Sequence, residues 1–217
     1  MSIRKTDFVP NEYYHIYNRG NSKQKIFHDK EDYERFLKLL FLSNGNNNFK
    51  IYFIKNDVIY DFNRGQQFVD IGAYCLMPNH FHILITQTEE GSISKFMQKL
   101  TTAYVMYYNE KYKRTGSLFE GKFKSEHVNN DRYLKYLFSY IHLNPIKLIE
   151  SKWKEVGIKN EVKAIDFLKN YKYSSFKDYL KESRRESIVL NKKSFPDYFP
   201  TAKTFIKEIL DWINYKN

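Results

Sequence analysis

The segment from His80 to Thr86 reads His-Phe-His-Ile-Leu-Ile-Thr, and it most constrains what this chain can fold into. Side chains on a β-strand point alternately to opposite faces of the sheet. Phe81, Ile83 and Ile85 therefore share one apolar face, while His80 and His82 share the other. The pattern predicts a strand that is anchored in a hydrophobic core and presents two imidazoles on the same side.

Strand-like and helix-like patterns follow one another along the rest of the chain. Strands are predicted over residues 13–18, 49–54, 68–77 and 81–86, and a basic strand or hairpin over residues 118–128. Pro78-Asn79 divides two of these runs, and we expect a bulge or a sheet edge there because Pro cannot donate to a ladder. Helices are predicted to begin after Asp29, after Ser92 or Ser94, after Asn130 or Asp131, and from about Thr201.

This order of elements is typical of an α+β fold, with a ferredoxin-like antiparallel sheet and helices packed on one face. A chain of 217 residues, 42% of them hydrophobic, can bury one sizeable core. We expect a main domain over residues 1–180 and a C-terminal helical appendage over residues 181–217.

Positive charge is concentrated in the middle of the chain. The formal net charge is +11, and residues 99–154 hold eleven Lys or Arg against five acids, an excess of six. Tyrosine and phenylalanine are interspersed with these charges, which suits single-stranded nucleic acid because bases stack on aromatic rings while cations follow the phosphates. The same residues also suit an ordinary core with a solvated charged face, and composition does not decide between the two.

The sequence disfavours a membrane protein, a secreted protein and a disulfide-stabilised protein. The start Met1–Lys5 lacks the apolar core of a signal peptide, and no apolar run is long enough to span a bilayer. The single cysteine, Cys75, excludes an intrachain disulfide and a multi-cysteine zinc site. We therefore expect a cytoplasmic protein with no membrane partner.

A second group of candidate site residues lies on the helix predicted before Pro145. Helical periodicity places Tyr133, Tyr136, Tyr140 and Asn144 on one flank, beside the apolar stripe. Tyr140 and Asn144 are one turn apart, so a phenol and an amide oxygen can face the same site. Spacing alone does not distinguish a catalytic role for these tyrosines from a structural role at the edge of the core. The two histidines can likewise be a structural pair at a sheet edge instead of metal ligands.

Five segments together resemble the single-tyrosine HUH transposases, in the group of the REP-associated tyrosine transposases and the IS200-like proteins. They occur in the family's order between about residues 10 and 180. The segments are Tyr14–Gly20 (YHIYNRG), Tyr74–Leu84 (YCLMPNHFHIL), Arg114–Lys124 (RTGSLFEGKFK), Tyr140–Pro145 (YIHLNP) and Tyr173–Phe176 (YSSF).

The resemblance implies roles for individual residues. His80 and His82 match the HUH pair, and Asn144 stands where relatives complete a site for Mg²⁺ or Mn²⁺. Tyr140 matches the catalytic nucleophile, with Tyr136, and after it Tyr133, in reserve. Position 123, which carries a tyrosine in some relatives, is a phenylalanine here and has no hydroxyl to attack with. Candidate DNA-binding residues are Arg19, Arg114, Lys122 and Lys124.

The resemblance also implies an activity. It is a transposase-like endonuclease and strand transferase that nicks and rejoins single-stranded DNA near hairpin elements through a 5′-phosphotyrosine. Two alternatives remain open: a non-catalytic module of the same fold that binds structured nucleic acid, and metal-dependent hydrolysis without a covalent step. The sequence also leaves open the DNA target, a monomer or a homodimer, and whether the last residues cap the sheet or hold a DNA hairpin.

Overall fold

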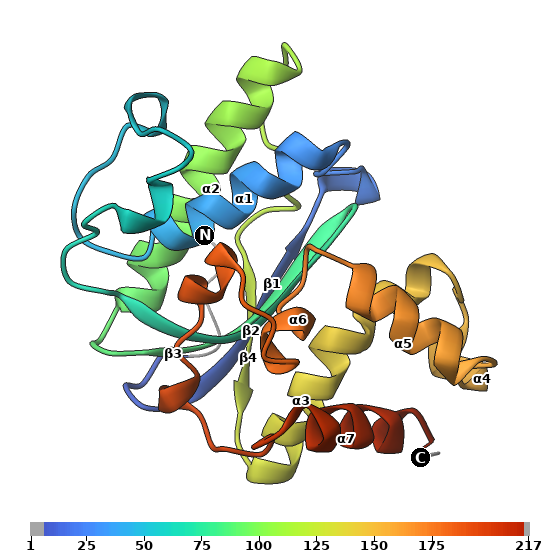
Figure 1. Cartoon of the computed structure of the whole chain (residues 1–217). Helices are drawn as coiled ribbons and strands as arrows, with labels where there is room; N and C mark the ends of the chain where they lie inside the picture. The colour runs from blue at the N-terminus through green and yellow to red at the C-terminus, as the bar shows by residue number, and fades with distance from the viewer. Residues whose placement is uncertain (1–6, 215–217) are drawn as a thin grey trace.

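The computed structural model describes residues 7–214 and contains one four-stranded antiparallel sheet (Figure 1). The strands are β1 (Tyr13–Arg19), β2 (Val69–Met77), β3 (His80–Gln87) and β4 (Lys124–Val128), in the spatial order β2-β3-β1-β4. Helix α1 (Lys30–Leu42) connects β1 to β2, and α2 (Ser92–Lys111) connects β3 to β4. This is the ferredoxin-like topology, so the predicted α+β class is confirmed.

Local signals in the sequence explain where the main elements begin. The Asp29 carboxylate accepts from the backbone N–H of Asp32 and caps α1, and Asn130 caps α3 (Asp131–Leu143) in the same way. Pro78-Asn79 forms the tight turn that joins β2 to β3, not a bulge within a strand. The irregular register lies elsewhere, between Ile71 and Ala73.

Two strand predictions are wrong in whole or in part. Residues 49–54 form no strand, and Ile51–Phe53 is a short 3₁₀ helix in which Phe53 is 82% exposed, because no neighbouring strand pairs with it. In residues 118–128 only β4 is a strand. The chain before it bends at Gly116 and Gly121, both at positive φ, and the intervening Phe119 turns into the core.

Helices cover both faces of the sheet (Figure 1). Helices α1 and α2 pack on the face formed by Phe81, Ile83 and Ile85, as predicted. The opposite face is not open. It carries Cys75 and Leu84, which pack beneath α3, so the prediction of helices on one face is wrong for the later helices. Strand β2 is buried on both sides, and only a second helical layer can remove both of its faces from water.

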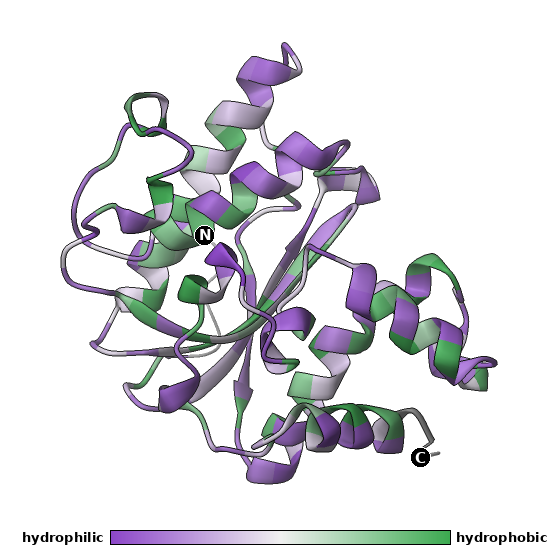
Figure 2. Ribbon diagram, viewed as in Figure 1, coloured by the Kyte–Doolittle hydropathy of each residue, from purple (hydrophilic) through white to green (hydrophobic). Residues whose placement is uncertain are grey.

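The last third of the chain builds this second layer. Its helices are α4 (Trp153–Val156), α5 (Glu161–Asn170), α6 (Phe176–Tyr179) and α7 (Ala202–Asn214), with 3₁₀ turns at Asn144–Leu148 and Lys192–Ser194. A further 3₁₀ turn, Arg185–Val189, instead packs against α1, and its Val189 lies in the core of the first layer. Helix α7 begins where the sequence predicts, and its residues alternate between hydrophobic and hydrophilic (Figure 2). Phe205 and Ile209 of α7 lie in the same core as α3.

The C-terminal segment also touches the sheet directly. A Cβ added at Gly72 would come within 2.8 Å of the Phe195 ring, so a larger residue at this position of β2 would have to displace that ring. Residues after 180 therefore share a core with the preceding ones, and the division at residue 180 stays a prediction. Met1–Lys5 lies outside the described residues. Among residues 7–214, no helix is long and apolar enough to cross a membrane.

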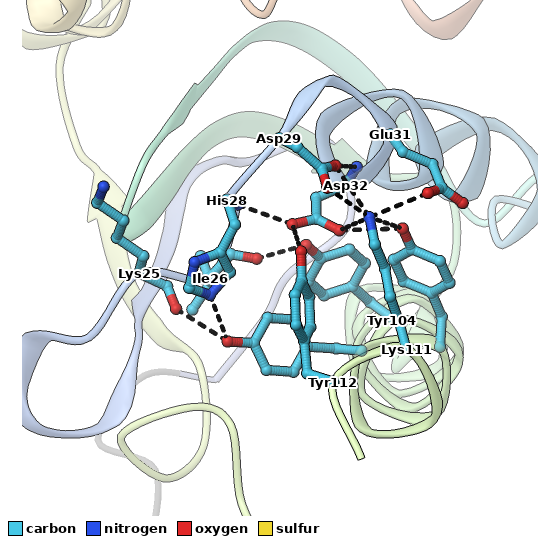
Figure 3. A network of polar contacts seen from close by, with 11 residues as sticks. Lys25, Ile26, His28, Asp29, Glu31, Asp32, Tyr104, Lys111 and Tyr112 are labelled. Atoms are coloured by element: carbon cyan, nitrogen blue, oxygen red, sulfur yellow. Dashed lines mark hydrogen bonds and ion pairs between the residues drawn. The ribbon is translucent and has the colours of Figure 1, made fainter. Parts of the chain in front are cut away.

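A buried carboxylate joins the two helices of the first layer (Figure 3). Asp32 is completely buried and accepts hydrogen bonds from the hydroxyls of Tyr107 and Tyr112, at 2.9 and 2.8 Å. Lys111 Nζ lies 2.9 Å from the same carboxylate, and the backbone N–H of His28 donates to it at 2.7 Å. The start of α1 is thus fixed to the end of α2.

Replacing Lys111 by Met is expected to lower the free energy of unfolding by roughly 3 kcal/mol, because it leaves the Asp32 charge buried without its cation. Lys95→Met, an exposed position on the same helix, is the matched control and should change stability little. Urea unfolding followed by circular dichroism measures both. Equal effects of the two substitutions would show that the Asp32 network does not stabilise the fold.

Candidate active site

The two histidines of β3 face the second helical layer. β3 lies between β1 and β2, and His82 is aligned with Tyr17 on one side and Cys75 on the other. The imidazole centroids of His80 and His82 are 5.0 Å apart, with their planes nearly perpendicular. His82 is 6% exposed and His80 is half-buried. The predicted shared face is confirmed.

Each imidazole is held through its Nδ1 atom. His80 Nδ1 lies 2.6 Å from the amide oxygen of Asn79, an acceptor, so Nδ1 carries the proton. His82 Nδ1 lies 2.8 Å from Nε2 of His15, which is buried on β1. This leaves Nε2 of His80 to serve as a ligand, and Nε2 of His82 is likewise free when the proton shared with His15 lies on Nδ1 of His82, a common arrangement around protein-bound metals.

Both imidazoles are neutral near pH 7. Burial lowers the pKa of His80 to about 4, with a further contribution from Lys147, while a hydrogen bond with Asn144 acts in the opposite direction. Burial also holds the pKa of His82 well below its ordinary value, helped by the neighbouring His15 and His80. A neutral imidazole has the lone pair that metal coordination needs.

Helix α3 brings a tyrosine and an amide to these histidines. Its apolar stripe packs on the sheet and points one flank at β3. The Tyr140 ring lies edge-on to His82, with centroids 5.4 Å apart, and 6.0 Å from His15. Asn144, at the end of α3, donates from Nδ2 to the Tyr140 carbonyl at 2.9 Å. Its amide oxygen can therefore turn towards His80.

The other two tyrosines of this flank have different surroundings. Ring centroids are 6.1 Å apart for Tyr133 and Tyr136 and 5.9 Å apart for Tyr136 and Tyr140, so the predicted common flank is confirmed. The Tyr133 hydroxyl donates to Glu126, and the Tyr136 ring packs against Trp212 of α7. Tyr140 is the member of the three that lines the cavity beside the histidines.

A cavity of about 600 Å³ opens in front of these groups. It contains both histidines, Tyr140 and Asn144, and its remaining walls are largely basic or polar. Other lining residues are Tyr17, Asn18, Arg19, Lys23, Met77, Pro78, Asn79, Lys124, Lys147, Leu148 and Lys154. The arrangement offers two nitrogen ligands, an amide oxygen and a phenol in a site that favours anions.

The four DNA-binding candidates fall in different places. Arg19 and Lys124 line the cavity, and Arg19 is paired with Glu120. Lys122 lines a neighbouring cavity of about 550 Å³ next to α2. Arg114 lies outside both of these cavities, where it donates to the Gln24 side chain at 3.2 Å and sits 5.5 Å from the centre of the Tyr108 ring.

Sequence reasoning did not single out several residues of the site. Lys154 places its ammonium 4.1 Å from the centre of the Tyr140 ring, and Lys147 lies close enough to act on His80. Both come from the segment after α3, whose path no pattern predicts. For His15 and His127 the sequence offers two roles, a place near the site or ordinary hydrogen bonding within a strand, and favours the second. Tyr17 and His15 alternate with buried Ile16 on β1, and the β1–β3 pairing brings the face that they share to His82.

The donor set fits a hard or borderline divalent cation. Two neutral imidazoles and one amide oxygen, with room for water and phosphate, suit Mn²⁺ or Mg²⁺. Within residues 7–214, no group of three or more His, Cys, Asp or Glu side chains is arranged to hold a metal. Asn144, which lines the same cavity, could supply a third protein ligand to a cation held by His80 and His82.

Comparisons with known proteins bear on the fold and the family. No curated protein matches the chain. A solved structure of a REP-associated tyrosine transposase bound to a REP hairpin is 13% identical, with a TM-score of 0.50, over 86% of this chain and 90% of that one. The tRNA(His) guanylyltransferase of Saccharomyces cerevisiae is 10% identical, with a TM-score of 0.37, over 100% of this chain and 85% of that one. The first likeness supports the fold, and the second is too distant to support an argument.

The family comparison is more decisive. The model of the family described as "Transposase IS200 like" matches residues 8–144, which is more than half of the chain. The matched region begins before β1, contains both histidines and Tyr140, and ends on Asn144. This chain belongs to the IS200-like transposase family.

Proposed function

We propose that this protein cuts and rejoins single-stranded DNA beside hairpin elements, with Tyr140 as the nucleophile. The placement of Tyr140 carries the proposal. Its ring lies against His82, and it lines the same basic cavity as His80 and Asn144. A tyrosine that served only to cover the core would have no need to share a cavity with two neutral imidazoles.

The reaction conserves the energy of the phosphodiester bond. The Tyr140 oxygen attacks phosphorus, forming a tyrosine–phosphorus bond as the bond from phosphorus to the 3′ oxygen breaks. The phenolic proton leaves, and the departing 3′ oxygen takes up a proton to become a hydroxyl. The phosphate stays joined to the 5′ oxygen of the next nucleotide, giving a 5′-phosphotyrosine. Attack by a 3′-hydroxyl reverses these bond changes and joins a strand without ATP.

The chain's own residues prepare this step. His80, His82 and Asn144 would hold Mg²⁺ or Mn²⁺, which would polarise the scissile phosphate and offset the charge that builds on its oxygens. Lys154, stacked on the Tyr140 ring, would stabilise the phenolate as its proton departs. Arg19 and Lys124, on the cavity wall, would hold the flanking phosphates.

The proposed partner is DNA that combines a hairpin with a single strand. The solved structure that shares this fold holds a REP hairpin. In this chain, the candidates Arg114 and Lys122 lie away from the catalytic cavity, where contacts to a hairpin stem could form without occupying the site. Lys122 has the partly buried Phe123 beside it in the second cavity, a setting suited to unpaired bases.

Tyr140→Phe should abolish the covalent adduct that forms when a labelled hairpin-plus-tail oligonucleotide is incubated with Mn²⁺ and the protein. Tyr136→Phe, one turn away on the same flank, is the matched control and should retain the adduct. Denaturing gel electrophoresis measures it. An adduct that is lost in Tyr136→Phe and kept in Tyr140→Phe would show that Tyr136, and not Tyr140, is the nucleophile.

The same assay separates the alternatives. Tight hairpin binding by the wild type, with neither nick nor adduct in any divalent metal, would favour the non-catalytic module. Nicked product that stays free of protein and persists in Tyr140→Phe would favour hydrolysis without a covalent step.

Metal removal should stop adduct formation. Chelation with EDTA, or His82→Ala, is expected to lower the rate about a hundredfold or more, since several kcal/mol of charge stabilisation would be lost. Added Mn²⁺ should rescue the chelated wild type and not the variant. His127→Ala, at an exposed histidine on β4, is the control. Full activity in EDTA would contradict a metal-dependent reaction.

Lys154→Met should slow adduct formation and weaken binding of the single-stranded tail. If Lys154 contacts one phosphate, the slope of log affinity against log salt should become shallower by about 1. Lys152→Met, an exposed neighbour that does not line the cavity, should leave the slope unchanged. Fluorescence anisotropy over a salt series measures the affinity and its salt dependence for each variant. If Lys154→Met has the same slope as the wild type, Lys154 does not contact a phosphate of the bound strand.

A further inference from the structure

Three side chains from three strands form a line that ends at the catalytic cavity. The Glu126 carboxylate of β4 lies 3.9 Å from His15 Nδ1 on β1, and His15 Nε2 lies 2.8 Å from His82 Nδ1 on β3. Both histidines are buried, at 5% and 6% exposure. The Glu126 carboxylate also accepts hydrogen bonds from the hydroxyls of Tyr17 and Tyr133, at 2.8 and 3.0 Å.

The short contact between the two imidazoles restricts their protons. Two ring nitrogens 2.8 Å apart need one proton between them, because two lone pairs would repel and two N–H groups would clash. Either His82 donates from Nδ1 and its Nε2 has a lone pair, or His15 donates from Nε2 and the neutral His82 has its proton on Nε2. Only the first arrangement lets His82 bind a metal through Nε2.

Glu126 selects between these arrangements. In the first, neutral His15 has its proton on Nδ1, directed at the carboxylate. In the second, the lone pair of His15 Nδ1 would face a negative charge. The interaction with His15, together with the two tyrosine hydroxyls, lowers the Glu126 pKa to about 2, so this group is ionised at neutral pH. The favourable arrangement is therefore the one that leaves a lone pair on His82 Nε2.

We propose that His15 is a positioning residue that, with Glu126 behind it, holds His82 in the tautomer that binds metal through Nε2. This inference rests on the proposed function, in which His82 is a metal ligand. His15 contacts neither metal nor DNA in this arrangement and acts through His82. Partners of this kind fix ring orientation and tautomer at many metal sites, and their loss typically lowers metal affinity about 10- to 100-fold.

The tautomer can be measured directly in the wild-type, metal-free protein. Long-range ¹H–¹⁵N correlation spectra at neutral pH distinguish a protonated ring nitrogen from one with a lone pair. The expected result is a proton on Nδ1 and a lone pair on Nε2 for both His15 and His82. A proton on Nε2 of His82 would overturn the proposal, and this measurement does not depend on the folding of any variant.

Mn²⁺ affinity, measured by isothermal titration calorimetry without DNA, provides a second test. His15→Phe keeps an aromatic ring but removes the acceptor, and it should weaken binding about 10- to 100-fold. His15→Gln supplies an amide oxygen that can accept from His82 Nδ1 and should recover part of this loss. His127→Phe is the matched control, because His127 on β4 also pairs with a carboxylate, that of Glu12, but is exposed and outside the site.

The outcomes separate this inference from the proposed function. If His82→Ala weakens Mn²⁺ binding and His15→Phe does not, the positioning role is wrong and the metal site stands. If His82→Ala also leaves Mn²⁺ affinity unchanged, the metal site itself is wrong. Thermal melts of each variant confirm that the folded protein is being titrated, and a His15→Phe chain that does not fold leaves the decision to His15→Gln and the wild-type spectra.

Discussion

The structure depends on β3 being an interior strand with two different faces. Phe81, Ile83 and Ile85 are completely buried against α1 and α2, and this burial fixes the strand's register. A slip of one residue would turn these apolar side chains to the cavity and the histidines into the core. The position of His80 and His82 is therefore set by the packing on the opposite side of the sheet.

The second helical layer completes the site. Helix α3 packs through its apolar stripe on Cys75 and Leu84, with α7 covering its outer side, and this contact brings Tyr140 to His82. His142, between Tyr140 and Asn144, is fully buried and bonds the Phe138 carbonyl and the Ser175 hydroxyl, at 2.8 and 2.7 Å. His142 is therefore a structural residue of α3.

Positive charge and burial both keep the two histidines neutral. The cavity is lined by Lys124, Lys147 and Lys154, which attract phosphate, and Lys147 and Lys154 also disfavour a charged imidazole. Burial acts in the same direction, so both rings stay neutral at the pH where they would bind a cation. The Glu126 carboxylate lies behind His15, where it can act on the ligand without lining the cavity.

The sequence by itself determined the strands around the two histidines, the capped helices, and the flank that carries Tyr140 and Asn144, because these follow from the local periods of two and 3.6 residues. It could not reveal the layer over the second face, the short 3₁₀ helix within residues 49–54, or the contacts of Lys154 and His15. Those depend on which strands pair and which segments far apart in the chain pack together. The pairing of β1 with β3 alone places His15 beside His82. The two residues are far apart in the chain, and no local pattern in the sequence specifies which strands will pair.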